Sequence, residues 1–223
     1  MVTEAILKIN PIQKKNFNWD VSANFSKFKS TVTHLPENNS GIVLASFTNI
    51  SSMILEGQPY GVIQGTYAAR DADGNLLINP TNGKIIASDD VGLEDKIIGD
   101  PNEDWFLSTI NTFRYKNWSL TAQLEYTHGG DIWSLSASNL LRRGVTTDTE
   151  DREGTFIIPG VLGDPDTGQP ILDGNGDLIR NTIQIGANDL YFINLQDVDE
   201  NIVYDASTIR LRNVSLTYSL PEK

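Results

Sequence analysis

The sequence has 223 residues, 39% hydrophobic and 9% aromatic content, and a formal net charge of −12 at pH 7. This charge argues against nucleic-acid binding, which needs basic patches, and the absence of cysteine excludes disulfides, thiolate metal sites and cysteine nucleophiles. No apolar run reaches about 18 residues, which excludes a membrane-spanning helix, whereas a barrel strand needs only about 9 to 11 alternating residues.

Two strands are predicted near the start of the chain. Residues 4–10, EAILKIN, form the first, and Pro11 is expected to end it because proline cannot donate to a strand ladder. Residues 16–33 form the second, in which aromatic and aliphatic side chains alternate with polar ones. One face of this strand is therefore apolar and the other polar. The apolar set is Phe17, Trp19, Val21, Ala23 and Phe25, and the polar set is Asn18, Asp20, Ser22, Asn24 and Ser26.

Residues 35–103 form a first long excursion, far beyond ordinary loop lengths. Within it, DADGN at 71–75 lies between YGVIQGTYAAR and LLINP, and the Asp, Gly and Asn residues predict a hairpin turn.

The strongest signal is at 104–128, which predicts two antiparallel strands, 104–115 and 118–128, joined by a tight turn at Lys116 and Asn117. In the second of these strands the apolar face begins and ends with an aromatic residue, and the polar face carries Glu125. This is typical of a membrane barrel strand with lipid on one side, a wet interior on the other and aromatic girdles at both interfaces. Asn111 interrupts the apolar face of the first.

A second long excursion, 129–205, contains a predicted short helix at 134–143 and a second hairpin signal, ILDGNGDLI, at 171–179. The last strand is predicted at 206–219, where the apolar phase slips by one residue near Asn213. A β-bulge there would restore the facing. With this facing, Glu125 and Arg212 should approach each other, directly or through Arg210.

Short and long connections alternate along the chain, as the short periplasmic turns and long extracellular loops of outer-membrane barrels do. The predicted fold class is therefore all-β: an antiparallel meander forming part of a transmembrane β-barrel, with residues 35–103 and 129–205 as extracellular loops. The charged side chains expected to face the lumen are Asp20, Arg114, Glu125, Arg210 and Arg212.

Four stretches resemble a known family. They are residues 16–35 (NFNWDVSANFSKFKSTVTHL), 57–79, 98–133 and 204–221, the last with the pattern YDAS-x-IRLRNVSL-x-Y-x-LP. The chain resembles the C-terminal barrel portion of SusC/RagA-type TonB-dependent outer-membrane transporters. The resemblance implies a 22-stranded barrel with an N-terminal plug. MVTEAILKIN lacks the basic start and apolar core of a signal peptide. Either the protein is not exported, or the sequence is an internal piece of a longer protein, and we favour the second explanation.

The resemblance also implies energy-dependent import of a nutrient such as an oligosaccharide or peptide, without a cofactor or a catalysed reaction. It implies an outer-membrane location in contact with lipid, a SusD-type surface lipoprotein as partner, and the TonB energising complex, engaged through N-terminal parts outside this sequence. Aromatic side chains in the two excursions are the candidates for contact with a substrate or partner, although packing within the loops would also explain them. They are Tyr60, Tyr67, Trp133, Tyr191 and Phe192.

Two other functions fit parts of the sequence. A soluble all-β carbohydrate-binding module with no transport role would bury the apolar strand faces against a second sheet. A loop-borne glycoside hydrolase would need two carboxylates about 5 to 10 Å apart facing a cleft. The acidic residues at 147–153, TDTEDRE, could hold such a pair, but a solvated loop explains them better.

No metal site is assigned. Asp173, Asn175 and Asp177 resemble the start of a calcium loop, but Leu178 and Gln184 stand where an EF-hand needs Gly and Glu. The turn chemistry of Asp, Asn and Gly therefore favours a hairpin, here and at 71–75. The two histidines, His34 and His128, lie at predicted strand ends and are interpreted as rim residues, not as members of a metal cluster or catalytic triad.

Overall fold

The computed structural model describes residues 2–48, 50–188 and 198–221. Five long strands lie in one antiparallel sheet in the order β1-β2-β8-β9-β15, which is their order along the chain. The predicted all-β antiparallel meander is thereby confirmed. Across the described part of the chain, every helix is too short or too polar to span a membrane. The strands are β1 (Val2–Lys14), β2 (Phe17–Phe28), β8 (Trp105–Tyr115), β9 (Trp118–His128) and β15 (Thr208–Tyr218).

The pairing register places side chains of the same kind in rows across the sheet. Trp118 of β9 pairs with Tyr115 of β8 and with Tyr218 of β15. Glu125 pairs with Ser108 and Arg210 on the opposite face. Because successive side chains of a strand point to opposite faces, each row belongs wholly to one face.

Two predicted strand ends are wrong. The first strand does not end at Pro11 but runs to Lys14, with a register shift between Ile9 and Ile12. Proline is tolerated here because β1 is at the edge of the described sheet and the ladder is already irregular. The second strand ends at Phe28 and not at residue 33. Beyond it, the backbone of Val32 bonds to the loop residues Gln58 and Gly57, each at 2.9 Å, instead of to β8.

The predicted bulge in the last strand is confirmed. The register of β15 against β9 shifts between Leu211 and Asn213, so that Arg212 is the extra residue. The predicted tight turn is also present. There Lys116 adopts the left-handed region at φ 49° and joins β8 to β9.

The described residues of the two long excursions, 35–48, 50–103, 129–188 and 198–205, fold together into a unit that we name the loop body. It contains a four-stranded antiparallel sheet, three two-stranded pairings and short helices. The four-stranded sheet is β3 (Ile42–Phe47), β4 (Ile50–Ile54), β5 (Val62–Gly65) and β7 (Lys96–Gly99). The pairs are β6 (Leu77–Ile78) with β12 (Val161–Leu162), β10 (Asp131–Trp133) with β14 (Val203–Asp205), and β11 (Thr155–Phe156) with β13 (Ile185–Gly186). The helices that lie wholly within the described residues are α1 (Leu135–Arg142), η1 (Thr147–Thr149) and η3 (Asp199–Ile202).

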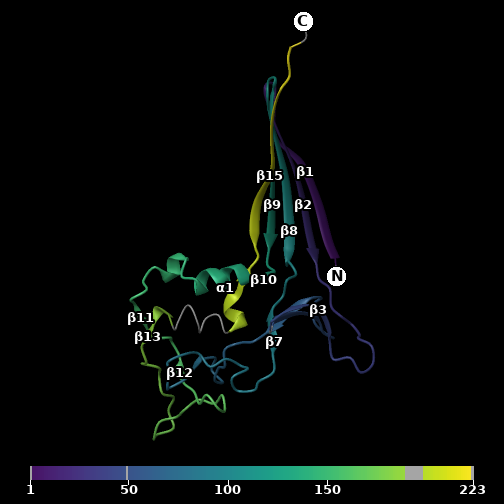
Figure 1. The fold of residues 1–223 in the computed structure, drawn as a ribbon. Helices are drawn as coiled ribbons and strands as arrows, with labels where there is room; N and C mark the ends of the chain where they lie inside the picture. The colour runs from purple at the N-terminus through teal and green to yellow at the C-terminus, as the bar shows by residue number, and fades with distance from the viewer. Residues whose placement is uncertain (1, 49, 189–197, 222–223) are drawn as a thin grey trace.

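The hydrophobic core of the molecule lies in the loop body. One cluster packs Ile78 and Ile85 of the first excursion against Ile158 and Ile185 of the second. The parallel pairing of β6 with β12 joins the same two excursions. Figure 1 shows the loop body at one end of the long sheet, opposite the end where the C-terminus lies. The two excursions therefore form one shared structure and not two separate loops.

The local predictions within the loop body are confirmed. In the hairpin at 71–75 the N–H of Asp71 donates to Asn75 O at 3.1 Å, and in that at 171–179 the N–H of Asp173 donates to Asp177 O at 2.9 Å. The predicted helix is α1, which begins after Ser134, whose hydroxyl oxygen accepts from the N–H of Ala137 as an N-cap.

Candidate functional site

The polar face of the long sheet carries a charged pair near its loop-body end. Arg212 Nε donates to Glu125 Oε2 at 2.6 Å, and Gln123 Nε2 donates to the other carboxylate oxygen at 3.2 Å. The Glu125 side chain is only 13% exposed. The predicted approach of Glu125 and Arg212 is thus confirmed. The bulge has a structural role here, because it lets Arg212 reach the carboxylate that Arg210 faces in the ladder.

A second charged cluster lies on the same face near the short turns. Asp20 of β2 forms an ion pair with Arg114 of β8 and accepts a hydrogen bond from the Asn10 side chain of β1. In the register, Asp20 stands opposite Thr112, and Arg114 stands opposite Asn18. The predicted charged residues therefore form two clusters on one face, and their orientation toward a lumen stays a prediction.

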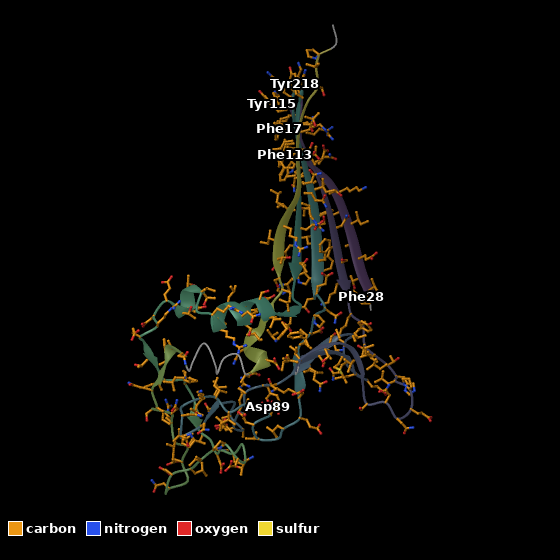
Figure 2. The ribbon with its side chains drawn as sticks, viewed as in Figure 1. Phe17, Phe28, Asp89, Phe113, Tyr115 and Tyr218 are labelled. Carbon is orange, nitrogen blue, oxygen red and sulfur yellow. The ribbon has the colours of Figure 1, made fainter. Side chains whose placement is uncertain are left out.

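The apolar face carries aromatic side chains at both ends of the strands. Phe17, Tyr115, Trp118 and Tyr218 share one register row at the short-turn end, where Figure 2 shows Phe17, Tyr115 and Tyr218 close together. At the loop-body end, the Trp105 ring contacts Tyr126 with centroids 4.9 Å apart. The ten residue-to-residue steps from Trp105 to Tyr115 cover about 33 Å of strand, or about 25 Å of height at a barrel tilt of about 40°. This matches the lipid-facing band of a membrane barrel.

Asn111, the polar residue on this apolar face, is hydrogen-bonded. The Trp19 indole N–H donates to Asn111 Oδ1 at 3.2 Å, and Asn111 Nδ2 donates to Thr109 Oγ1 at 3.4 Å. A polar group in an apolar setting costs little when its bonds are satisfied. The sequence could not show this, because Trp19 and Asn111 are 92 residues apart.

The aromatic candidates of the loop body occupy different settings. Tyr60 is exposed, and Tyr67 is half-buried with Lys96 Nζ 3.6 Å from its ring centroid. Trp133 packs against Phe47 with ring centroids 6.2 Å apart. Its buried indole N–H finds no acceptor among the described residues, an arrangement that costs about 1 to 3 kcal/mol. Tyr191 and Phe192 lie outside the described residues.

Two cavities meet at Trp133 and Phe47. The first, about 230 Å³, lies against β3 and β4 and is lined by Ala45, Ser46, Phe47, Ile50, Ser51, Ser52, Ile63 and Trp133. The second, about 350 Å³, lies against α1 and η3 and is lined by Phe47, Thr48, Trp133, Leu135, Ser138, Asn139, Arg142, Asp199 and Ile202. Sequence reasoning found only Trp133 among these residues.

Asp199 links the two excursions from a buried position. Its Oδ2 accepts from the backbone N–H of Thr66 at 3.1 Å and from the Thr66 hydroxyl at 2.9 Å. Partial burial raises the pKa of Asp95, and the negative charges of Asp199 and Asp89 raise it further. Thr66 and Asp199 are 133 residues apart, so no local pattern could have predicted the pair.

In the two Asp-rich hairpins, the carboxylates of Asp71 and Asp173 accept hydrogen bonds from residues of the same turn. Backbone N–H groups of Asp177 and Asn175 lower the pKa of Asp173. The Asn75 side chain, followed by backbone N–H groups, lowers the pKa of Asp71. Within residues 2–48, 50–188 and 198–221, no three His, Cys, Asp or Glu side chains are grouped to hold a metal ion.

The remaining polar candidates lie apart from the cavities. His34 is exposed, with its Nδ1 3.8 Å from Glu56, and His128 Nδ1 lies 3.2 Å from the Tyr126 hydroxyl at the end of β9. The carboxylates of residues 147–153 are all exposed. This segment therefore has the solvated character that its composition predicts.

Comparisons with known proteins agree with the resemblance seen in the sequence. No family model matches the chain. A curated relative, TonB-dependent receptor P3 of Formosa agariphila, is 25% identical over 95% of the chain, which spans about a fifth (20%) of that relative. In fold, the chain is similar to the RagAB peptide transporter, with a TM-score of 0.58 and 16% identity. This match covers 99% of the chain and 23% of the neighbour.

A second solved structure, the RagAB peptide importer in the closed-closed state, matches with a TM-score of 0.55 and 19% identity over the same shares of the two chains. At these identities the structural matches define the fold. Together with the curated relative, they confirm the resemblance to part of a SusC/RagA-type TonB-dependent transporter.

Proposed function

We propose that these residues form part of an outer-membrane, TonB-dependent transporter that imports a nutrient such as an oligosaccharide or a peptide. The observation that carries the proposal is the two-faced long sheet. Its apolar face has aromatic rows at both ends, separated by about the height of a lipid-facing band, and its polar face carries two charged clusters. A sheet of this kind can form part of a barrel wall that has lipid on its apolar side and water on its polar side.

The parts of the chain take distinct roles in this proposal. The apolar face contacts lipid, and the polar face lines a wet interior, where Asp20–Arg114 and Glu125–Arg212 cross-link neighbouring strands. The loop body lies outside the cell, in the region where a SusD-type surface lipoprotein would dock. Energy comes from the TonB complex, acting on N-terminal parts that the resemblance implies. No chemical step is proposed, since the relatives are a receptor and transporters.

The structure favours this function over a soluble carbohydrate-binding module. A soluble sandwich buries its apolar strand faces against a second sheet. Here, among the described residues, every buried hydrophobic side chain lies outside the five long strands. Leu216 is 65% exposed and Leu124 is 43% exposed, and a contiguous apolar surface of this kind marks a membrane or protein contact.

The test uses the absence of cysteine in the sequence. Single variants Asn175→Cys, at a loop-body turn, and Lys15→Cys, at a short turn, are introduced into the chromosomal gene. Intact cells are treated with a membrane-impermeant thiol reagent, and the outer membrane is then isolated. We expect labelling of the first variant only, and labelling of both after permeabilisation. Labelling of Lys15→Cys alone in intact cells, or absence of the protein from the outer membrane, would refute the proposal.

A further inference from the structure

The two cavities of the loop body share Phe47 and Trp133 and differ in the rest of their lining. The cavity against β3 and β4 has a mostly apolar lining, in which the polar side-chain groups are the hydroxyls of three serines and the indole N–H of Trp133. The cavity against α1 and η3 adds Asn139, Arg142 and Asp199. Phe47 and Trp133 line both cavities. A ligand that fills both must be apolar at one end and polar at the other.

The cavity against α1 and η3, which we call the polar cavity, is lined by one acidic and one basic side chain, Asp199 and Arg142, that do not form an ion pair with each other. Asp199 is 92% buried, and only its Oδ2 accepts bonds among the described residues, so Oδ1 remains available to a donor. Arg142 is exposed and forms no ion pair within the described part of the chain. Both side chains line the cavity, yet no ion pair joins them. The space between them fits a ligand that carries both a donor and an acceptor of hydrogen bonds.

We infer that these cavities form a peptide-binding subsite. An apolar side chain of the peptide occupies the cavity beside β3 and β4, against Phe47 and Trp133. The adjoining carboxylate or carbonyl binds Arg142, and an amine or amide N–H donates to Asp199. The indole N–H of Trp133, which has no acceptor among the described residues, gains one from a peptide carbonyl if the ring turns toward it. This inference rests on the proposed function for its place in transport, but not for binding itself.

An oligosaccharide is less complementary than a peptide to the residues that line these two cavities. A sugar can stack on Trp133 and bond to Asp199 and Arg142, but its ring carries hydroxyls on every side. In the cavity beside β3 and β4, most of these hydroxyls would meet the apolar side chains of Ala45, Phe47, Ile50 and Ile63. Burying polar groups without partners opposes binding. A phenylalanine or leucine side chain loses no hydrogen bond there.

The inference is tested by titration of the full 223-residue chain in detergent micelles, with Ala-Phe-Ala as the probe. Binding is followed by calorimetry and by tryptophan emission. The other three tryptophans, at positions 19, 105 and 118, lie in the long strands, so the emission change should disappear in Trp133→Phe while calorimetric binding persists more weakly. Ala-Gly-Ala should bind about tenfold more weakly than Ala-Phe-Ala, because it loses the buried side chain.

Matched variants separate specific contacts from loss of folding. Arg142→Gln should weaken Ala-Phe-Ala about tenfold, the usual effect of losing a charge-assisted bond. Arg143→Gln is the control, since Arg143 is exposed at the end of the same helix but does not line the cavity. Ala45→Leu fills the apolar cavity, and it should abolish the preference for Ala-Phe-Ala over Ala-Gly-Ala while circular dichroism stays unchanged.

Three results would overturn the inference: equal affinity for the two peptides, equal effects of Arg142→Gln and Arg143→Gln, or tighter binding of maltotriose than of Ala-Phe-Ala. The last would make this a sugar site. The labelling experiment in cells is independent of these titrations. Peptide binding by a protein that is absent from the outer membrane would refute transport alone, and correct labelling without peptide binding would refute the subsite alone.

Discussion

The loop body and the long sheet place their hydrophobic side chains in opposite ways. In the loop body, Leu77 and Ile78 are completely buried in a core that both excursions build. In the long sheet, hydrophobic side chains such as Leu124 and Leu216 line an open face. The first arrangement is stable in water, and the second is stable only when another apolar phase covers the face. The hydrophobic side chains of this chain therefore lie in two different environments, a protein core in the loop body and an open face on the long sheet.

The largest effect is expected in the loop-body core. Leu77→Ala should destabilise the loop body by about 2 to 5 kcal/mol, because it removes a fully buried side chain and leaves a cavity. Hydrogen exchange of the protein in detergent should show faster exchange in the loop body and unchanged exchange in the long strands. Leu172→Ala, at a 52% exposed position, is the control. If hydrogen exchange became faster to the same extent in the long strands, the loop body and the long sheet would unfold together and not independently.

A charge placed on the apolar face of the long sheet should have the next largest effect. Leu124→Arg should cost about 2 to 4 kcal/mol if the residue sits near the bilayer midplane. Gln123→Arg, on the polar face of the same strand, should be tolerated. The readout is the amount of folded protein in the outer membrane. Similar losses for both variants would contradict the two-faced interpretation of the sheet.

A smaller effect is expected for the ion pair between Glu125 and Arg212. A double-mutant cycle with Glu125→Gln and Arg212→Gln should give a coupling free energy of about 1 kcal/mol, because the arginine is more than half exposed and screened by solvent. Chemical denaturation in detergent measures it. Zero coupling would mean that the bulge positions Arg212 without an energetic contribution from the pair.

The smallest effect concerns acid sensitivity of the hairpin at 171–179. The folded turn lowers the pKa of Asp173, chiefly through the backbone N–H of Asp177, so its contribution to stability is present above the unfolded pKa. It is lost as the pH falls through the depressed pKa, in the region below about pH 4. An NMR titration should show the turn resonances changing there in the natural protein and not in Asp173→Asn. A raised pKa would contradict the turn geometry.

The sequence was most informative where a strand is half-exposed. Alternation in 118–128 reports the two faces directly, and the phase slip near Asn213 is enough to predict the bulge and the contact of Glu125 with Arg212. Strand ends were harder to predict. Whether residues 29–33 continue β2 depends on where its neighbour β8 begins, and that strand lies more than 70 residues further along the chain.

The candidate site was largely hidden from the sequence for a related reason. Trp133 could be singled out as a loop aromatic, but its neighbour Phe47 comes from the other excursion. Asp199 becomes a site residue only because Thr66 holds it in place from 133 residues away. Such long-range contacts leave no local periodicity, whereas the turns at 71–75 and 171–179 are determined by adjacent residues and were predicted correctly.

The central claim is that the apolar face of the long sheet requires lipid or detergent to cover it. The direct measurement is sizing and thermal melting of the 223-residue chain, produced once with detergent and once without. Without detergent, the open apolar face and the outer edges of β1 and β15, which pair with no strand among the described residues, should lead to large aggregates and no cooperative melt. With detergent, the loop body should melt cooperatively. A monodisperse monomer with a cooperative melt in plain buffer would contradict the account and favour a soluble β-sandwich.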